Sequence, residues 1–214
     1  MKKEFKGSEM LSPVPAVMVS LGEGEEANII TIAWTGIINS RPPMTYVSIR
    51  KSRFSHDILM KTGEFVINLT TEALASKTDW CGVKSGRDLD KWKETGLTKE
   101  KASVVKCPMI KESPVNLECK VTEVKELGSH DMFMAEIVKV HVDESIIDED
   151  GHFDVVGAGL IAYIHGHYYG IRRKPLGRFG FSVMKPKTKK RLSREAHEKR
   201  VRDNRRKSKG SAVK

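Results

Sequence analysis

The stretch PVNLECKVTEVKELGSHDMFMAEIVKVHV (114–142) decides the fold, because its apolar residues alternate with polar ones and then change phase. In the first half, a period of two places four apolar residues on one face, Val115, Leu117, Cys119 and Val121. The next apolar residue is Val124, so the alternation slips by one position. In the second half, one phase holds Phe133, Ala135 and Ile137, and the opposite phase holds Val138, Val140 and Val142. Two neighbouring long strands that both change phase predict β-bulges and strong coiling, as in a sheet that curls into a barrel.

Other parts of the chain are also rich in strand-forming residues. Turn residues separate three further β-rich segments, NIITIAW (28–34), MTYVSIR (44–50) and EFVINL (64–69). Short helices are expected after an N-cap at Ser55 and before Gly63, and over 72–80 and 88–96. Strands do not alternate regularly with long helices, which disfavours a doubly wound parallel sheet. We therefore predict a mainly β protein, an antiparallel barrel with a few short decorating helices.

The net charge of +10 is concentrated at the C-terminal end of the chain. Residues 185–214 contain fourteen Lys and Arg against three Asp and Glu, so the rest of the chain is nearly neutral. This segment has few large apolar residues and cannot bury a core. We predict one domain over 1–184 and a solvated basic tail over 185–214. Such a tail can bind nucleic acid through its charge or simply add solubility, and the sequence leaves both open.

No apolar run approaches the ~18 residues that a membrane-spanning helix needs. The N-terminal MKKEFKGSEML (1–11) is not followed by the apolar region of a signal peptide, so a cytoplasmic location is expected. The three cysteines at 81, 107 and 119 are widely spaced without a CxxC pair. Neither a disulfide framework nor a zinc site is indicated, and we predict no metal site.

Cations and hydroxyls gather between Arg50 and His56. Arg50 and Arg53 supply charge, Ser52 and Ser55 supply hydroxyls, and a helix is expected to begin near Ser55. These donors, with the free N–H groups of a helix N-terminus, are the ones that hold a phosphate dianion. The alternative is a solvated turn in which Ser55 merely caps the helix.

Two further segments are candidates for a binding site. The loop CGVKSGRD (81–88) has two glycines that let the backbone approach a ligand, although it lacks the GxxxxGK[ST] pattern of a P-loop. GAGLIAY (157–163) lacks the full GxGxxG pattern, so no Rossmann site is inferred. His130 begins a strand where a sheet meets a loop, a position that suits either ordinary hydrogen bonding or catalysis. Lys51 is left out of the cluster because strand alternation points it away from Arg50.

Taken in order, six segments make the chain resemble the flavin reductase-like family of FMN-binding split barrels, most of all the flavoredoxins. They are NIITIAWTG (28–36), VSIRKSRFSHDIL (47–59), GEFVINL (63–69), DWCGVKSGRDLDKWKETGL (79–97), LGSHDMFMAEIVKV (127–140) and GLIAYIHGHYYGI (159–171). The resemblance implies a six-stranded antiparallel Greek-key barrel that forms a homodimer. It also implies that FMN binds in a groove near the subunit interface.

The resemblance further implies roles for individual residues. The strand that borders the isoalloxazine ring would contribute Thr31, Ala33 and Trp34. The segment that holds the ribityl chain and phosphate would contribute Ser48, Arg50, Ser52, Arg53, Ser55 and His56. The second loop, which closes over the flavin, would contribute Cys81, Gly82, Ser85, Gly86 and Lys91.

The chain departs from the family pattern at one point. Many NAD(P)H-dependent members carry Gly-Asp-His where this chain has Gly128-Ser129-His130. The missing aspartate favours a ferredoxin-like or other electron donor, while the retained His130 keeps NAD(P)H open and is the predicted catalytic residue. We expect an FMN-dependent oxidoreductase in which the flavin carries the hydride or electrons. The alternatives are a flavin carrier without turnover and a nucleic-acid-binding module that uses the basic tail.

Overall fold

The computed structural model describes residues 1–171, 174–195, 198 and 201. Contacts divide the chain into two units, Met1–Arg173 and Lys174–Lys214. Within the second unit, the described residues form a short 3-10 helix, Phe181–Val183, and a helical stretch that starts at residue 186. The boundary expected between residues 184 and 185 stays a prediction. None of the helices in the described ranges is both long and apolar enough to cross a bilayer.

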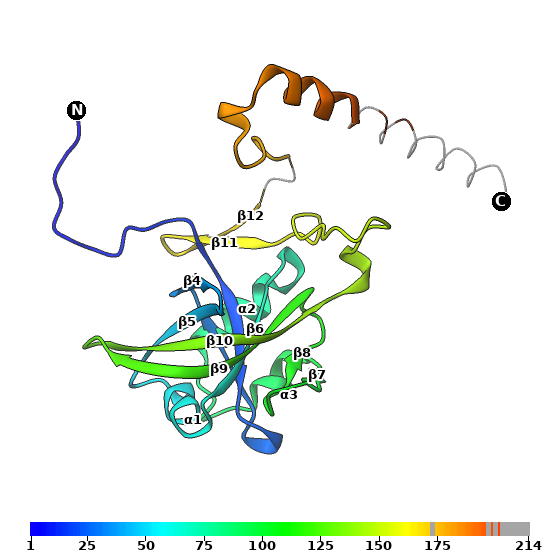
Figure 1. Ribbon diagram of the computed structural model, residues 1–214. Coiled ribbons are helices and arrows are strands. Elements are labelled where there is room, and N and C mark those ends of the chain that lie inside the picture. The colour runs from blue at the N-terminus through cyan, green and yellow to red at the C-terminus, as the bar shows by residue number, and fades with distance from the viewer. Residues whose placement is uncertain (172–173, 196–197, 199–200, 202–214) are drawn as a thin grey trace. The chain divides into compact units, whose positions relative to one another are not determined.

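The first unit is built on one curled antiparallel sheet with the strand order β3-β2-β6-β9-β10-β5-β4 (Figure 1). Its strands are β2 (Val17–Leu21), β3 (Asn28–Ile32), β4 (Thr35–Ser40), β5 (Pro43–Arg50), β6 (Glu64–Asn68), β9 (Val115–Glu126) and β10 (His130–Val142). The mainly β class and the antiparallel pairing are confirmed. The predicted number of six strands is not, because seven strands pair, although only two residues separate β3 from β4.

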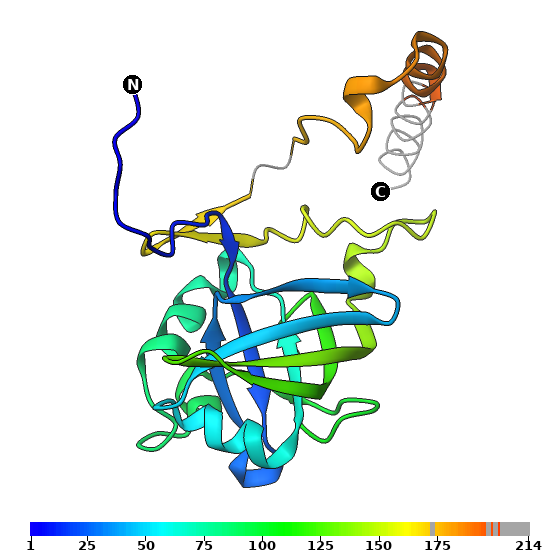
Figure 2. The ribbon, with the colours of Figure 1, turned by 60° about the vertical axis from the view of Figure 1, so that its left-hand side comes forward.

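The two long strands β9 and β10 carry the irregularities that the sequence predicts. Their pairing shifts register between Met134 and Ala135, where Thr122 of β9 has no direct partner. It shifts again between Ile137 and Lys139, where Val138 is the extra residue of β10. These are the places at which the apolar pattern changes phase, as expected for an extra residue that turns the following side chains to the opposite face. Val138, at the second bulge, still packs against a core cluster, whereas Val124 and Val140 are exposed. The sheet bends across these strands to form a half-barrel (Figure 2).

The main core fills the concave face of this half-barrel, and Phe65 and Phe133 are its largest fully buried side chains. Strand β5 shows how the alternation positions a site. Thr45, Val47 and Ile49 are buried, so Ser48 and Arg50 point to the other face.

A buried carboxylate ties the segment 103–105 to the sheet. Glu118 of β9 accepts hydrogen bonds from the main-chain N–H groups of residues 103–105 at 2.6–2.8 Å and lies 2.5 Å from Nε2 of His141. Burial alone would raise the pKa of Glu118, but these hydrogen bonds outweigh burial and lower it. Glu118 therefore stabilises the fold as an ionised group.

Three short helices decorate the sheet, as expected: α1 (Phe54–Thr62), α2 (Ala75–Val83) and α3 (Lys91–Thr95). Helix α1 ends at Gly63, which adopts the left-handed conformation (φ 63°) and donates its N–H to the Leu59 carbonyl. The predicted N-cap is wrong, because Arg53 occupies that position and Ser55 lies in the first turn. The remaining strands form two small sheets, β1 (Val14–Pro15) with β11 (Ile161–Ile164) and β12 (His167–Gly170), and β7 (Lys99–Glu100) with β8 (Met109–Ile110).

Candidate functional site

Two adjoining cavities lie where β3, β5 and α1 meet the loop after α2. The first, called the basic cavity here, has a volume of about 400 Å³ and is lined by Asn28, Ile30, Arg50, Ser52, Arg53, Phe54, Ser55, Cys81, Gly82, Lys84, Ser85, Gly86, Arg87 and Lys91. The second, the aromatic cavity, measures about 330 Å³ and includes Thr31, Ala33, Trp34, Ser48, Asp79, Val83, His130, Tyr163 and Tyr168 in its lining. Both cavities are lined by Ile30, Arg50, Arg53 and Gly82, so they adjoin and together form the candidate site.

The N-terminus of α1 opens into the basic cavity. No described side chain caps this end, and the N–H of His56 donates to the Arg53 carbonyl oxygen at 2.9 Å, which leaves the N–H groups of Phe54 and Ser55 for a ligand. Ser55 is buried in the first turn, and its hydroxyl oxygen accepts a 2.9 Å hydrogen bond from Nδ2 of Asn28. The Ser55 hydroxyl is therefore held in place with its own proton still available to donate. This end of the cavity offers the N–H and O–H donors that an anion requires.

Lys91 brings a buried positive charge to the same end. Its side chain is 4% exposed, and Nζ donates to the carbonyl oxygens of Ile29 at 2.8 Å and Cys81 at 2.7 Å. An ammonium group has three donors, so one remains. Among the described residues, Lys91 has no carboxylate partner. Burial, with a smaller effect of Arg53, lowers the pKa of Lys91 to about 8. A buried cation without a counterion fits a phosphate dianion.

The last turn of α2, with Gly82, and the loop after it, with Gly86, lie very close to β3. A Cβ atom on Gly86 would lie 2.4 Å from Oδ1 of Asn28, and one on Gly82 would lie 3.2 Å from Cβ of Thr31. The first distance is too short for a Cβ atom unless the Asn28 side chain shifts, and that shift would disturb the hydrogen bond from Asn28 to Ser55. The two glycines thus allow a close approach to β3, while the predicted approach of the backbone to a ligand stays a prediction.

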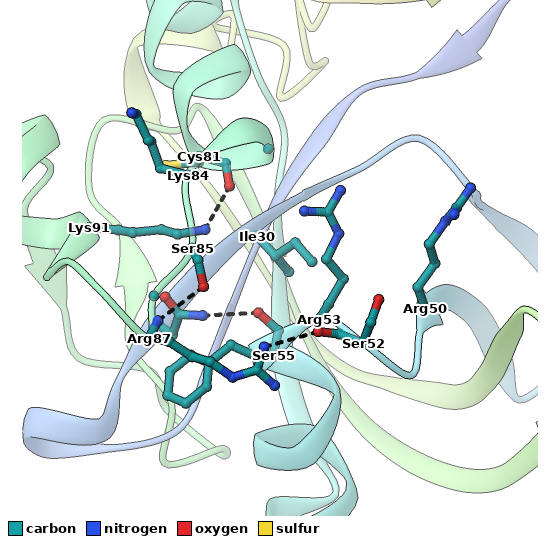
Figure 3. Close-up of a pocket in the computed structure, with 14 residues that line it drawn as sticks. Ile30, Arg50, Ser52, Arg53, Ser55, Cys81, Lys84, Ser85, Arg87 and Lys91 are labelled. Carbon is teal, nitrogen blue, oxygen red and sulfur yellow. Dashed lines mark hydrogen bonds between the residues drawn. The ribbon is translucent and has the colours of Figure 1, made fainter.

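Arg50 and Arg53 frame the junction between the two cavities. In the part of the chain that the structure describes, neither forms an ion pair, so both charges are available to a ligand. In the view of Figure 3, Ser55, Ser85 and Lys91 surround one end of the basic cavity, with Arg53 beside them and Arg50 farther along the rim. The basic cavity is thus positively charged along its whole length.

The aromatic cavity contains the predicted catalytic residue. His130 pairs directly with Arg50 across β10 and β5, and its Nδ1 lies 2.9 Å from Oγ of Ser129. Burial, followed by the positive charge of Arg50, lowers the pKa of His130. The imidazole is therefore neutral at neutral pH and available as a proton acceptor or hydrogen-bond donor.

Two tyrosines of the β11–β12 hairpin form the opposite wall of the aromatic cavity. The rings of Tyr163 and Tyr168 pack edge to face with centroids 5.3 Å apart. The Tyr168 hydroxyl donates to Oδ1 of Asp79 at 3.2 Å. Burial and the negative charge of Asp79 raise the pKa of Tyr168 to about 12. This wall is apolar and aromatic, with one phenol that stays protonated.

Thirteen of the fourteen predicted cofactor-binding residues line one or both cavities, and His56 does not. Its ring is buried, with Nε2 2.8 Å from Oδ2 of Asp131 and the Phe133 ring 5.5 Å away, edge to face. The structure thus places His56 behind the first turn of α1, where it supports Ser55 rather than facing a ligand. Lys51 points away from the cavities, as its alternation predicts, and its Nζ lies 2.7 Å from Oε2 of Glu126.

Cys81 lines the basic cavity, but its side chain is fully buried in a core cluster and its carbonyl oxygen binds Lys91. Burial raises the pKa of the thiols of Cys81, to about 11, and of Cys107, to about 12. Burial also raises the pKa of Cys119. All three thiols are free and buried, which excludes Cys81 as a nucleophile at neutral pH.

The predicted site did not include twelve of the lining residues: Ala16, Asn28, Ile30, Ile32, Ile49, Phe54, Asp79, Val83, Lys84, Arg87, Tyr163 and Tyr168. Most of these residues could have been predicted, because they lie inside or beside the sequence segments that resemble the family. Tyr163 and Tyr168 also lie inside such a segment, 159–171, but only the folded chain shows that this hairpin lines the same cavity as Asp79 and Val83 of α2.

Comparisons with known proteins agree with this geometry. Residues 9–172 match the family described as "Flavin reductase like domain". An uncharacterized protein of Archaeoglobus fulgidus is 33% identical over 147 residues, which cover 69% of this chain and 81% of the relative. A flavoredoxin of Desulfovibrio vulgaris (Miyazaki F) has a similar structure, with a TM-score of 0.79, 29% identity, and coverage of 86% of this chain and 100% of the other.

A third similar protein shares the fold at lower identity. The structure of an FMN-binding protein from Thermus thermophilus, solved with bound 1-cyclohex-2-enone, has a TM-score of 0.70 at 24% identity. The structural match covers 83% of this chain and 97% of the Thermus thermophilus chain. Because the family match extends over most of the chain and agrees with the half-barrel and its cavities, this protein belongs to the flavin reductase-like domain family.

Proposed function

We propose that this protein binds FMN in the adjoining basic and aromatic cavities and acts as an FMN-dependent oxidoreductase. The observation that carries the proposal is Lys91, a buried ammonium group without a carboxylate partner among the described residues. It lies at one end of a site whose other end is aromatic. A flavin mononucleotide has the same polarity, with a dianionic phosphate at one end and a planar ring at the other.

The basic cavity would hold the phosphate and ribityl chain. Lys91, Arg53 and Ser55 supply charge and hydroxyl donors, and the first turn of α1 supplies main-chain N–H groups. The aromatic cavity would hold the ring against Thr31 of β3 and against Ala33 and Trp34, which follow this strand. Both volumes fall in the range of small-molecule sites, about 300–1,000 Å³.

A bound flavin would supply the redox chemistry by accepting and passing on a hydride or single electrons. The side chains would bind and orient it. His130 is the side chain best placed to contact the ring or the electron donor, because it faces the aromatic cavity beside Arg50. Tyr168, kept protonated by burial and Asp79, would exclude water on the other side.

The first test is the colour of the purified protein. With FMN bound, it should absorb near ~375 and ~450 nm, as oxidised flavoproteins do. Arg50→Ala should weaken FMN retention, because it removes one of the two charges at the junction of the cavities. A colourless protein that takes up no added FMN would refute the proposal. Oxidation of NAD(P)H or of a reduced ferredoxin would identify the donor, and its absence would favour a flavin carrier.

The basic tail supports a second candidate, binding to nucleic acid. The structure describes only residues 185–195, 198 and 201 of this segment, and two of its arginines pair with glutamates four residues on, Arg191 with Glu195 and Arg194 with Glu198. Deleting residues 185–214 should abolish salt-dependent RNA or DNA binding and leave FMN binding unchanged. Loss of FMN binding would instead assign the tail to the flavin site. A homodimer and a cytoplasmic location remain part of this proposal.

A further inference from the structure

A third cavity lies beyond the end of the basic cavity that would hold the phosphate. This acidic cavity has a volume of about 610 Å³, the largest of the three. The lining residues that it shares with the basic cavity are Asn28, Phe54, Gly86, Arg87 and Lys91. A ligand whose phosphate lies near Lys91 therefore has room on its far side for a group of considerable size.

Arg87 crosses the boundary between the two cavities. It comes from the loop after α2, and its Nη1 donates to the Ser52 carbonyl oxygen at 3.1 Å. Its Nη2 lies 3.8 Å from Oδ2 of Asp57, and its guanidinium carbon lies 5.7 Å from the centroid of the Phe54 ring. These contacts join the loop to α1 and hold the Arg87 side chain at the boundary between the two cavities, both of which it lines. Figure 3 shows Arg87 among the residues that line the basic cavity.

The charge of the acidic cavity opposes entry of a second phosphate. Five carboxylates line it, Glu25, Glu26, Asp57, Asp88 and Asp90. The lining cations are Lys91, which faces the basic cavity as well, Arg87, and Lys61, whose Nζ lies 3.4 Å from Oε2 of Glu26. A pyrophosphate that extends into this cavity would meet like charge, whereas a terminal phosphate would stay on the basic side.

We propose that Arg87 makes the site selective for flavin mononucleotide over flavin adenine dinucleotide, by closing the phosphate end of the basic cavity. The inference rests on the proposed function, since it requires that the flavin phosphate lies beside Lys91. The adenosine half of the dinucleotide would need the space of the acidic cavity, and Arg87 separates it from the flavin site. Shortening this side chain joins the two cavities.

The test compares dissociation constants for FMN and FAD, measured by ultrafiltration with flavin absorbance, in the wild type, Arg87→Ala and Lys84→Ala. The last is the matched control, because Lys84 is a cation of the same loop that lines the basic cavity but not the acidic one. In the wild type FMN should bind at least about tenfold more tightly than FAD, and Arg87→Ala should reduce that ratio by about tenfold. Lys84→Ala should weaken both flavins alike and leave the ratio unchanged.

Each other outcome contradicts the proposal at a different point. An unchanged ratio in Arg87→Ala, or an equal change in both variants, would show that Arg87 acts only as one more positive charge. A wild type that binds both flavins equally would show that Arg87 does not make the site selective for FMN over FAD. Binding of neither flavin by the wild type would refute the proposed function itself, and the inference with it.

Discussion

The buried ammonium of Lys91 makes FMN affinity depend on pH in a way that the structure specifies. In the free protein, burial holds the pKa of Lys91 at about 8. A phosphate dianion beside it favours the charged form and raises that pKa in the complex. FMN binding therefore takes up a proton above pH 8, and affinity must fall as the pH rises.

The size of the effect follows from the protonated fraction of the free protein. A group with a pKa of about 8 is about nine-tenths protonated at pH 7 and about one-tenth at pH 9, so the dissociation constant for FMN should rise about tenfold, or about 1.4 kcal/mol. Arginine guanidinium groups stay charged over this range and do not contribute. The same lowered pKa predicts that the free protein gains stability between pH 8 and pH 10.5, because only the unfolded chain then holds the Lys91 proton.

Titration of FMN fluorescence quenching at pH 7, 8 and 9 measures the effect directly. Lys91→Met should weaken binding at pH 7 roughly 10- to 150-fold, the loss of one charge-assisted hydrogen bond of about 1.5–3 kcal/mol, and should abolish the pH dependence. Lys84→Met is the control and should keep the pH dependence of FMN binding. A wild type whose affinity is constant from pH 7 to 9, or a Lys91→Met variant that still shows the tenfold change, would refute the assignment.

Four further single variants and one double variant test the loop that lines the basic cavity and two buried contacts of the sheet. Gly86→Ala places a Cβ atom 2.4 Å from Oδ1 of Asn28 and should cost about 1–3 kcal/mol of FMN affinity, measured by the same titration; unchanged binding would show that the loop adapts. Glu118→Gln should lower the free energy of unfolding by about 3 kcal/mol in urea at pH 7. Because the folded pKa of Glu118 is lowered, its contribution is present at neutral pH and lost on acidification, so wild type and variant should converge at low pH. Asp131→Ala removes the hydrogen-bond partner of His56 and should lower the free energy of unfolding by about 2–3 kcal/mol. His56→Ala should lower it by the same amount. If the effects of the two substitutions were additive in the double variant, a direct interaction between the two side chains would be contradicted.

The phase changes in residues 114–142 predicted the curled sheet because a bulge is a local event. An extra residue such as Thr122 or Val138 shifts the alternation of apolar and polar residues in its own strand. This shift is visible in the amino-acid sequence of that strand alone. The number of strands is harder to predict. Ala33 and Trp34 interrupt one extended segment and divide it into β3 and β4, and no change in composition marks that bend.

The candidate site, like the fold, could be predicted from the sequence only in part. The alternation of β5 predicts which residues face away from the core, and it separates Arg50 from Lys51 correctly. His56 looks like part of the same cluster, but one turn of helix directs it inward to Asp131, which lies 75 residues further along the chain. The Tyr168–Asp79 contact joins residues 89 positions apart, and only the folded chain brings them together. Sequence patterns locate functional segments, whereas the direction of each side chain depends on distant packing.

The three buried thiols have a practical consequence for a protein expected to work at a redox centre. A cysteine reacts with peroxide or an alkylating reagent as the thiolate, and here burial raises the pKa of all three. The folded protein therefore resists the oxidants that a reduced flavin can produce in air. Labelling of Cys81, Cys107 or Cys119 requires the surrounding core cluster to open. The cysteines are thus natural reporters of local unfolding, distributed over the three parts of the core.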